Sequence, residues 1–170
     1  MKPCALALGL ALLPSPAGAE VVAASANGFE VRQTIDAAVP PGAAFAKFQD
    51  VGSWWSGEHT YSGQASNLSL ALSPGGCWCE RTPGGGVQHM QVIYVDRGKR
   101  LVMSGSLGPL LYLATAGVMD VQFKRTPKGS QITVDYRAAG FFNGGADKIA
   151  PVVDSVLSEQ VKRLGASLTR

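Results

Sequence analysis

The residues of this chain best suited to chemistry are two cysteines, a glutamate and a histidine that lie within one short segment. Cys77, Cys79 and Glu80 precede a turn rich in glycine, and His89 follows it. Alternating apolar and polar residues on both sides of the turn predict a β-hairpin, so these side chains can meet across two strands. Two thiols can form a disulfide or bind a metal, and a carboxylate beside an imidazole can transfer protons.

The two cysteines have more than one possible role. Residues two apart in an extended strand share a face, with Cα atoms about 6.5–7 Å apart. That separation is near the upper end of disulfide geometry. A bond between Cys77 and Cys79 therefore requires a bulge, which Gly75 and Gly76 would permit. The simplest interpretation is that both thiols are free and pack as small apolar side chains.

A metal site is a further interpretation of the same hairpin. If its turn centres on Gly84, Cys79 lies opposite His89, on the face that both cysteines share. Two thiolates and an imidazole suit zinc or copper, and His59 or Glu58 could supply a fourth ligand. A single C-x-C motif is a weak metal signal, so we favour no metal and expect no cofactor.

Glu80 and His89 form the alternative constellation. If the strand register is shifted by one residue, His89 faces Glu80 and Trp78 instead of the cysteines. The pair could then act as a general acid and base inside a cavity. We favour a plainer interpretation, in which the two are a polar cross-strand pair on the solvent face. A uniform register allows only one of the two constellations.

Residues 1–19 have the pattern of a secretory signal peptide. Lys2 supplies the positive start, and residues 4–13 form an apolar run too short to span a bilayer. Small residues at 17 and 19 fit a cleavage site, so we expect cleavage near Ala19 and a secreted or periplasmic protein. Residues 20–27 are then expected to form a flexible leader before a single domain over 28–170.

Charge and hydropathy exclude two classes of partner. The chain has 15 basic and 12 acidic residues, a net charge of +3, and loss of Lys2 with the signal peptide would leave +2. The basic residues are scattered, which is unlike a nucleic-acid surface. No later apolar run has the length of a membrane helix, so we expect no stable membrane insertion. The oligomeric state is not predicted.

The remaining pattern predicts an α+β fold. Strands are expected at 29–36, 68–72, 77–81, 87–96, 100–107, 118–125 and 131–138, joined by tight turns as in an antiparallel meander. Short helices are expected at 43–48 and 51–55. An amphipathic helix is expected from near Ala146, with Pro151 in its first turns. This helix would cover one face of a curved sheet of six to seven strands, leaving a cavity between them.

The chain resembles the START-like helix-grip superfamily, also called SRPBCC or polyketide cyclase-like. The resemblance covers roughly residues 28–168. It rests on the segments Phe29–Val31, Ile35–Ala37, Pro40–Pro41, Phe45–Phe48, Asp50–Trp55, His59–Gly63, Gly75–Glu80, Tyr94–Leu101 and Gly105–Pro109. It is greatest to exported members. It implies a helix-grip fold with an internal cavity that binds lipids, hormones or polyketides, and some members are cyclases or hydrolases. The superfamily has no single catalytic motif, so no reaction transfers with the fold.

The function we favour is the binding of a small hydrophobic or amphipathic molecule. Aromatic and apolar residues that could contact it are Trp54, Trp55, His59, Tyr61, Trp78, Met90, Phe141 and Phe142. Residues 107–113 could form a flap or a wall of the cavity. One alternative is a cyclase- or hydrolase-like enzyme that uses His89 with Glu80, or His59 with Glu58. A second alternative is a thiol redox or metal site at the hairpin.

Overall fold

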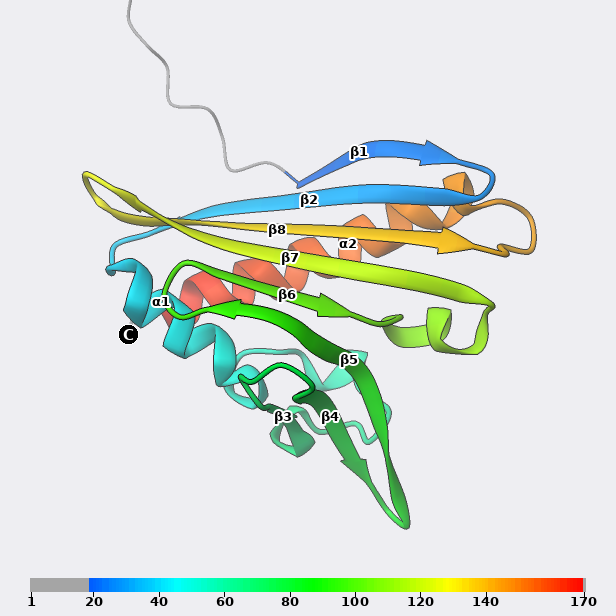
Figure 1. Cartoon of the computed structure of the whole chain (residues 1–170), viewed down its shortest axis with the longest axis horizontal. Coiled ribbons are helices and arrows are strands. Elements are labelled where there is room, and N and C mark those ends of the chain that lie inside the picture. Colours follow the sequence, from blue (N-terminus) through cyan, green and yellow to red (C-terminus); the bar gives the residue numbers. More distant parts are fainter. Residues whose placement is uncertain (1–18, 170) are drawn as a thin grey trace, which may run out of the picture.

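The computed structural model describes residues 19–169, which form one curved antiparallel sheet of eight strands and two α-helices (Figure 1). The strands lie in the order β1-β2-β8-β7-β6-β5-β4-β3. Except at the β2–β8 pair, each strand lies beside its neighbour in the chain, as in the predicted meander. The strands are β1 (Ala19–Ser25), β2 (Gly28–Ala37), β3 (Leu68–Leu70), β4 (Cys77–Thr82), β5 (Gly85–Asp96), β6 (Arg100–Ser104), β7 (Thr115–Thr126) and β8 (Gly129–Gly140).

The helices all lie in segments that leave the sheet. They are α1 (Pro41–Gln49), α2 (Ala146–Ser167) and the short 3₁₀ helices η1 (Val51–Ser53), η2 (Gly57–His59), η3 (Ala65–Asn67) and η4 (Gly108–Tyr112). Helix α2 begins at Ala146 as predicted, and Pro151 lies in its second turn, where the helix tolerates it. None of the helices within residues 19–169 is both long and apolar enough to cross a membrane.

Helix α2 covers one face of the sheet because its apolar residues recur every three to four positions. Leu157, Val161 and Leu164 are buried against the sheet, mainly along β1 and β2. A polar contact also holds the helix in place, since Gln33 Nε2 donates to Asp154 Oδ1 at 2.6 Å. The architecture is the α+β helix-grip arrangement that the sequence predicted.

The N-terminal part of the sheet differs from the prediction. Residues 20–27, expected to be a flexible leader, are mostly strand β1, which pairs antiparallel with β2 and reaches Ser25 opposite Gly28. The sheet thus has eight strands rather than six to seven. The small and polar side chains of this segment gave no strand pattern. An edge strand gains its stability more from backbone hydrogen bonds than from burial of apolar side chains. The predicted signal peptide lies outside the described residues, except for Ala19.

A row of aromatic rings links α1 to the centre of β4. The ring centroids are 5.4 Å apart for Phe48 and Trp54, 5.6 Å for Trp54 and Trp55, and 5.0 Å for Trp55 and Trp78. Tilted and edge-to-face contacts at these separations are favourable. The row fixes the position of Trp78 on β4.

Candidate functional site

A cavity of about 590 Å³ lies between the N-terminal half of α2, the η4 segment and the inner face of β4 and β5. Its volume falls in the usual range for small-molecule sites, roughly 300–1,000 Å³. Most of the lining is apolar or aromatic. The lining residues are Trp55, Glu58, His59, Thr60, Tyr61, Leu68, Trp78, His89, Leu107, Gly108, Pro109, Leu110, Tyr112, Leu113, Lys148, Ile149, Val152, Val153, Val156 and Leu157.

Alternation along β4 separates its side chains into two sets. Trp78 and Glu80 are buried, whereas Cys77 and Cys79 are half-buried on the opposite face. Trp78 lines the cavity, and neither cysteine does. The cysteines and the candidate acid–base pair therefore occupy different faces of the same hairpin.

A β-bulge on β5 decides where His89 points. Cys77 lies opposite Gln91, but Cys79 lies opposite Gln88, so the register shifts between Trp78 and Cys79. The shift leaves one extra residue on β5, and the consecutive side chains of His89 and Met90 are both buried. The predicted pairing of Cys79 with His89 is thus wrong, although the register that predicted it does hold at Cys77. Because of the bulge, the strands follow one register at Cys77 and Trp78 and another from Cys79 onward.

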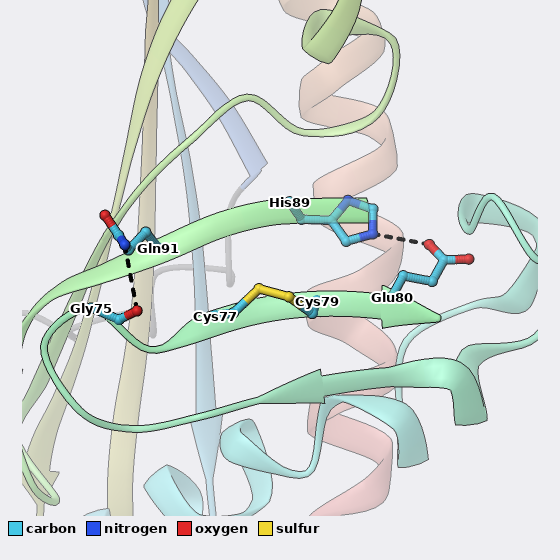
Figure 2. Close-up of a disulfide and its surroundings, with 6 residues drawn as sticks. All are labelled: Gly75, Cys77, Cys79, Glu80, His89 and Gln91. Carbon is cyan, nitrogen blue, oxygen red and sulfur yellow. Dashed lines mark hydrogen bonds and ion pairs between the residues drawn. A yellow bond between two sulfur atoms is a disulfide. The ribbon is translucent and has the colours of Figure 1, made fainter. Parts of the chain in front are cut away.

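The bulge brings His89 to Glu80. The distance from His89 Nε2 to Glu80 Oε2 is 2.9 Å (Figure 2). Glu80 also accepts hydrogen bonds from the backbone N–H groups of Tyr61, at 3.1 Å, and Ser62. Glu80 is 1% exposed and His89 6% exposed, so the solvent-face interpretation was wrong. The pair is buried at the wall of the cavity.

Electrostatics sets the roles of the two partners. Burial raises the pKa of Glu80, but hydrogen bonds from Ser62, Tyr61 and His89 outweigh it, and the net pKa is below the ordinary value. The ionised carboxylate can only accept hydrogen bonds, so the proton between them belongs to His89 Nε2. In the neutral imidazole, Nδ1 is then a free base. This is the arrangement of a general base oriented by a carboxylate.

Cys77 and Cys79 are joined by a disulfide, with their Cα atoms 5.3 Å apart (Figure 2). This is shorter than the spacing of an extended strand, and the contraction coincides with the register shift opposite the bulge. The interpretation as free, packed thiols was therefore wrong. Closing so short a loop contributes about 1–2 kcal/mol by the chain-entropy model.

The predicted metal ligands are not brought together. Both sulfur atoms of the cysteines are used in the disulfide, and His89 is directed to Glu80. Across the part of the chain that the structure describes, no three His, Cys, Asp or Glu side chains are grouped closely enough to hold a metal ion. The proposed fourth ligands, His59 and Glu58, lie elsewhere on the cavity lining.

The other predicted acid–base pair is not formed. His59 Nε2 lies 3.4 Å from Oε2 of Glu159 on α2 instead of pairing with Glu58. Both His59 and Glu58 are exposed residues of η2 at the edge of the cavity. The contact with Glu159 connects η2 to the middle of α2, so its role is to hold the edge of the cavity to the helix.

Half of the predicted ligand-contacting residues line the cavity. These are Trp55, His59, Tyr61 and Trp78. The lining does not include the other four, Trp54, Met90, Phe141 and Phe142. Trp54, Met90 and Phe142 are buried in the core, and Phe141 is 70% exposed. Phe142 packs on Phe29 with ring centroids 5.9 Å apart, so it closes the end of the core and not the mouth of the cavity.

The sequence predicted a cavity beneath α2 but none of the helix residues that line it. These include Ile149, Val152, Val153 and Val156, which recur at three- and four-residue spacing. Val152 is 63% exposed, more than packing against a sheet would allow. The apolar periodicity of a helix does not indicate which of its turns pack on the sheet and which line a cavity.

The segment predicted as a flap or wall does border the cavity. Residues 107–110, 112 and 113 are part of the lining, and η4 occupies most of this segment. Tyr61 ties the segment to η2, because its hydroxyl donates to the carbonyl of Gly108 at 2.8 Å. The rings of Tyr61 and Tyr112 also meet edge to face, with centroids 6.2 Å apart. Tyr112 lines the cavity and is also 76% exposed.

No protein-family model and no curated protein matches this chain. Solved structures do match. An uncharacterised protein from Rhizobium leguminosarum has a TM-score of 0.62 at 17% identity, over 86% of this chain and 97% of that chain. Protein MLL2253 from Mesorhizobium loti has a TM-score of 0.58 at 16% identity, over 83% and 97%.

A third similar structure has a named role. It is the di-domain ARO/CYC StfQ from the steffimycin biosynthetic pathway, with a TM-score of 0.57 at 14% identity. The match covers 84% of this chain and 51% of StfQ. At such identities the three structures show a shared fold, and the fold alone does not carry a reaction or a ligand.

We predict that Glu80→Gln makes the protein less stable at neutral pH and flattens its stability at acid pH. The ordinary pKa of the carboxyl is 4.5, and its folded value is lower. Its stabilising contribution is therefore complete above about pH 4.5 and is lost as the pH falls through the folded pKa. Losing the charged hydrogen bonds should cost about 1–3 kcal/mol at pH 7.

The measurement is urea unfolding at several pH values from about 7 to about 3, followed by tryptophan fluorescence. Glu58→Gln is the matched control, since Glu58 is exposed and makes no hydrogen bond or ion pair within residues 19–169. The free energy of unfolding of Glu58→Gln should fall in acid as it does in the unmodified protein. An unchanged acid dependence in Glu80→Gln would contradict the assigned ionisation of Glu80.

Proposed function

We propose that this protein binds a small, largely apolar molecule in the cavity beneath α2. The observation that carries the proposal is the apolar cavity itself, about 590 Å³ in volume. Small-molecule sites are typically concave, apolar and furnished with few polar groups. Here the polar groups on the sheet side belong to a single pair, His89 and Glu80, with the indole of Trp78 beside it.

The shape of the lining favours an elongated ligand. The lining residues of α2 extend from Lys148 to Leu157, which corresponds to about 13–14 Å along the helix. Three apolar residues of the lining are exposed, namely Tyr61, Tyr112 and Val152. Exposed apolar groups of this kind commonly mark the entrance to a binding site. We propose that the ligand enters between η4 and α2.

Membership of the START-like helix-grip superfamily is part of this proposal. The residue segments described above resemble that superfamily, and the similar structures include one named ARO/CYC. Both support a cavity-based function. Neither identifies the ligand, because similarity of fold at these identities leaves the cavity lining free to differ.

We predict that Val156→Trp, which places a bulky side chain in the cavity, weakens binding of an apolar probe at least about tenfold. The added ring would occupy space that the probe needs. A tenfold loss of affinity corresponds to about 1.4 kcal/mol of binding free energy. The measurement is fluorescence titration with N-phenyl-1-naphthylamine, which brightens in apolar surroundings. Ser155→Trp, an exposed position on the same helix, should bind like the unmodified protein. Equal affinities in the two variants would place the probe outside this cavity.

A second candidate function is catalysis within the cavity. The buried His89–Glu80 pair favours it, because an imidazole oriented by a carboxylate is a ready general base. His89 Nδ1 would take a proton from water or from a carbon acid, and Glu80 would stabilise the imidazolium that forms. Cyclase-like and hydrolase-like reactions both begin with such a step.

The hydrolase form of this candidate is tested with p-nitrophenyl esters of increasing chain length. Water would attack the ester carbonyl as His89 takes its proton, and nitrophenolate would leave. His89→Gln should then slow hydrolysis by about 10²–10⁴-fold, the usual contribution of a general base. Arg81→Gln, an exposed change on the neighbouring strand β4, should leave the rate unchanged. A wild-type rate no faster than buffer would count against ester hydrolysis.

We also propose that the protein is exported. The Cys77–Cys79 disulfide supports this, since such bonds persist in oxidising compartments. Cleavage near Ala19 would leave β1 almost whole. Intact mass spectrometry of the periplasmic protein should give a chain beginning near Glu20 that gains two hydrogens on reduction. Retention of residues 1–19, or no gain in mass, would contradict the proposal.

A further inference from the structure

The Cys77–Cys79 disulfide lies on the outer face of the β4–β5 hairpin and spans the step of β4 at which the register shifts. We infer that this disulfide is a redox switch, which holds His89 against Glu80 when oxidised and releases it when a dithiol reduces the bond. The inference concerns regulation of the proposed binding site, and its physiological meaning rests on that proposed function.

The bond lies at the surface of the sheet. Both cysteines are half-buried, and the two residues paired with Cys79, Ser69 on β3 and Gln88 on β5, are exposed. Gln91, which is paired with Cys77, is exposed as well. The disulfide therefore has polar, exposed neighbours on this face, and access is one of the conditions that control thiol–disulfide exchange.

The bond contributes little as a general brace of the fold. Only Trp78 lies between the two cysteines, so closing this loop restrains the unfolded chain little. Both ends of the bond lie on β4, so it connects no two separate elements of the sheet. Its effect on the folded protein is therefore local, on the spacing of β4 itself.

Oxidation shortens β4 at the point where β5 is long. The Cα atoms of Cys77 and Cys79 are 5.3 Å apart, whereas residues two apart in an extended strand are separated by about 6.5–7 Å. At the same step β5 carries the extra residue. A shortened strand beside a bulged one bends the pair, and Figure 1 shows the β4–β5 hairpin bending away from β6 toward its tip.

The two ends of the hairpin are anchored, so a change in the length of β4 reaches the bulge. At the open end, Gly75 N–H donates to the carbonyl of Val92, and Val92 N–H to that of Gly76, both at 2.8 Å. At the closed end lies the tight turn at Gly84, whose φ of 80° suits glycine. Because neither end is free to slide, β4 can lengthen only by changing the pairing at the bulge, where His89 lies.

Glu80 stays in place when the bulge changes. Its carboxylate accepts from the backbone N–H groups of Tyr61, at 3.1 Å, and Ser62, and neither bond involves β5. The contact from His89 Nε2 to Glu80 Oε2, at 2.9 Å, is made between the two strands (Figure 2). A displacement of His89 by about 1 Å would take this distance beyond the range of a hydrogen bond.

The redox step is thiol–disulfide exchange. A thiolate of the reducing dithiol attacks one cysteine sulfur and displaces the other as a thiolate, which leaves a mixed disulfide. The second thiol of the reductant then attacks the mixed disulfide and releases the first cysteine. Cys77 and Cys79 together gain two electrons and two protons, and the dithiol becomes a disulfide. In an oxidising compartment the bonded form is the resting state.

The experiment follows the imidazole N–H of His89 in the mature protein by nitrogen–proton NMR. The chain has only two histidines, so His59 serves as an internal control, and the spectrum of His59→Gln assigns the remaining signal to His89. When dithiothreitol is added, we expect the Nε2–H proton of His89 to exchange with water at least about tenfold faster, because its hydrogen bond to Glu80 is lost. The signal of His59 should not move.

A double variant separates loss of the bond from other effects of the reductant. Cys77→Ser combined with Cys79→Ser cannot form the disulfide, so its His89 N–H should exchange fast with and without dithiothreitol. Ser69→Ala, an exposed change opposite Cys79, should respond to dithiothreitol as the unmodified protein does. Near-ultraviolet circular dichroism checks that each protein keeps its tertiary structure, and the comparison of oxidised with reduced wild type needs no variant.

Three results would overturn the switch. Equal exchange of the His89 N–H in oxidised and reduced wild type would show that the bond does not control the contact with Glu80. No gain of two hydrogens by mass spectrometry under native conditions would show that the bond is closed to thiols. Loss of the near-ultraviolet signal on reduction would indicate general unfolding. The NMR readout needs no ligand, so failure to bind an apolar probe would count against the proposed function alone.

Discussion

The bulge between β4 and β5 is the constraint on which the candidate site depends. Without an extra residue on β5, alternation would place His89 and Met90 on opposite faces of the sheet. With it, both are buried, and His89 reaches Glu80 and the cavity. The Cys77–Cys79 disulfide contracts β4 opposite this point, on the other face. The hairpin thus combines a covalent link on one side with the polar pair on the other.

The cavity exists because α2 is held to the sheet at some places and not at others. Beyond Leu157 the helix packs closely, with Val161 and Leu164 buried. Two side chains of α2 also bond to the segment that follows α1. Gln160 Oε1 accepts from the backbone N–H of Ser56 at 2.8 Å, and Arg163 Nε donates to the carbonyl of Trp54 at 2.9 Å. The earlier turns of α2 face η4 and the hairpin across open volume instead. The helix can therefore cover a ligand without surrendering the contacts that hold it.

The polar pair and the apolar lining are compatible with both proposed functions. A carboxylate that already accepts several hydrogen bonds keeps the imidazole in one tautomer. That single tautomer leaves Nδ1 as a hydrogen-bond acceptor in a binding protein and as a proton acceptor in an enzyme. The two functions differ in whether a reacting atom of the ligand comes within reach of Nδ1.

The linear pattern of residues was enough for the fold class, most strands and the start of α2 at Ala146, because these follow from local periodicity and turn chemistry. It also identified the hairpin and the four side chains on it. It failed at β1, whose stability comes from pairing with β2 and not from its own side chains. It failed again at His89, since a bulge depends on how two strands meet and leaves no period in either one. Burial of Glu80, closure of the disulfide and the empty space beside Val152 likewise arise only when distant segments pack together.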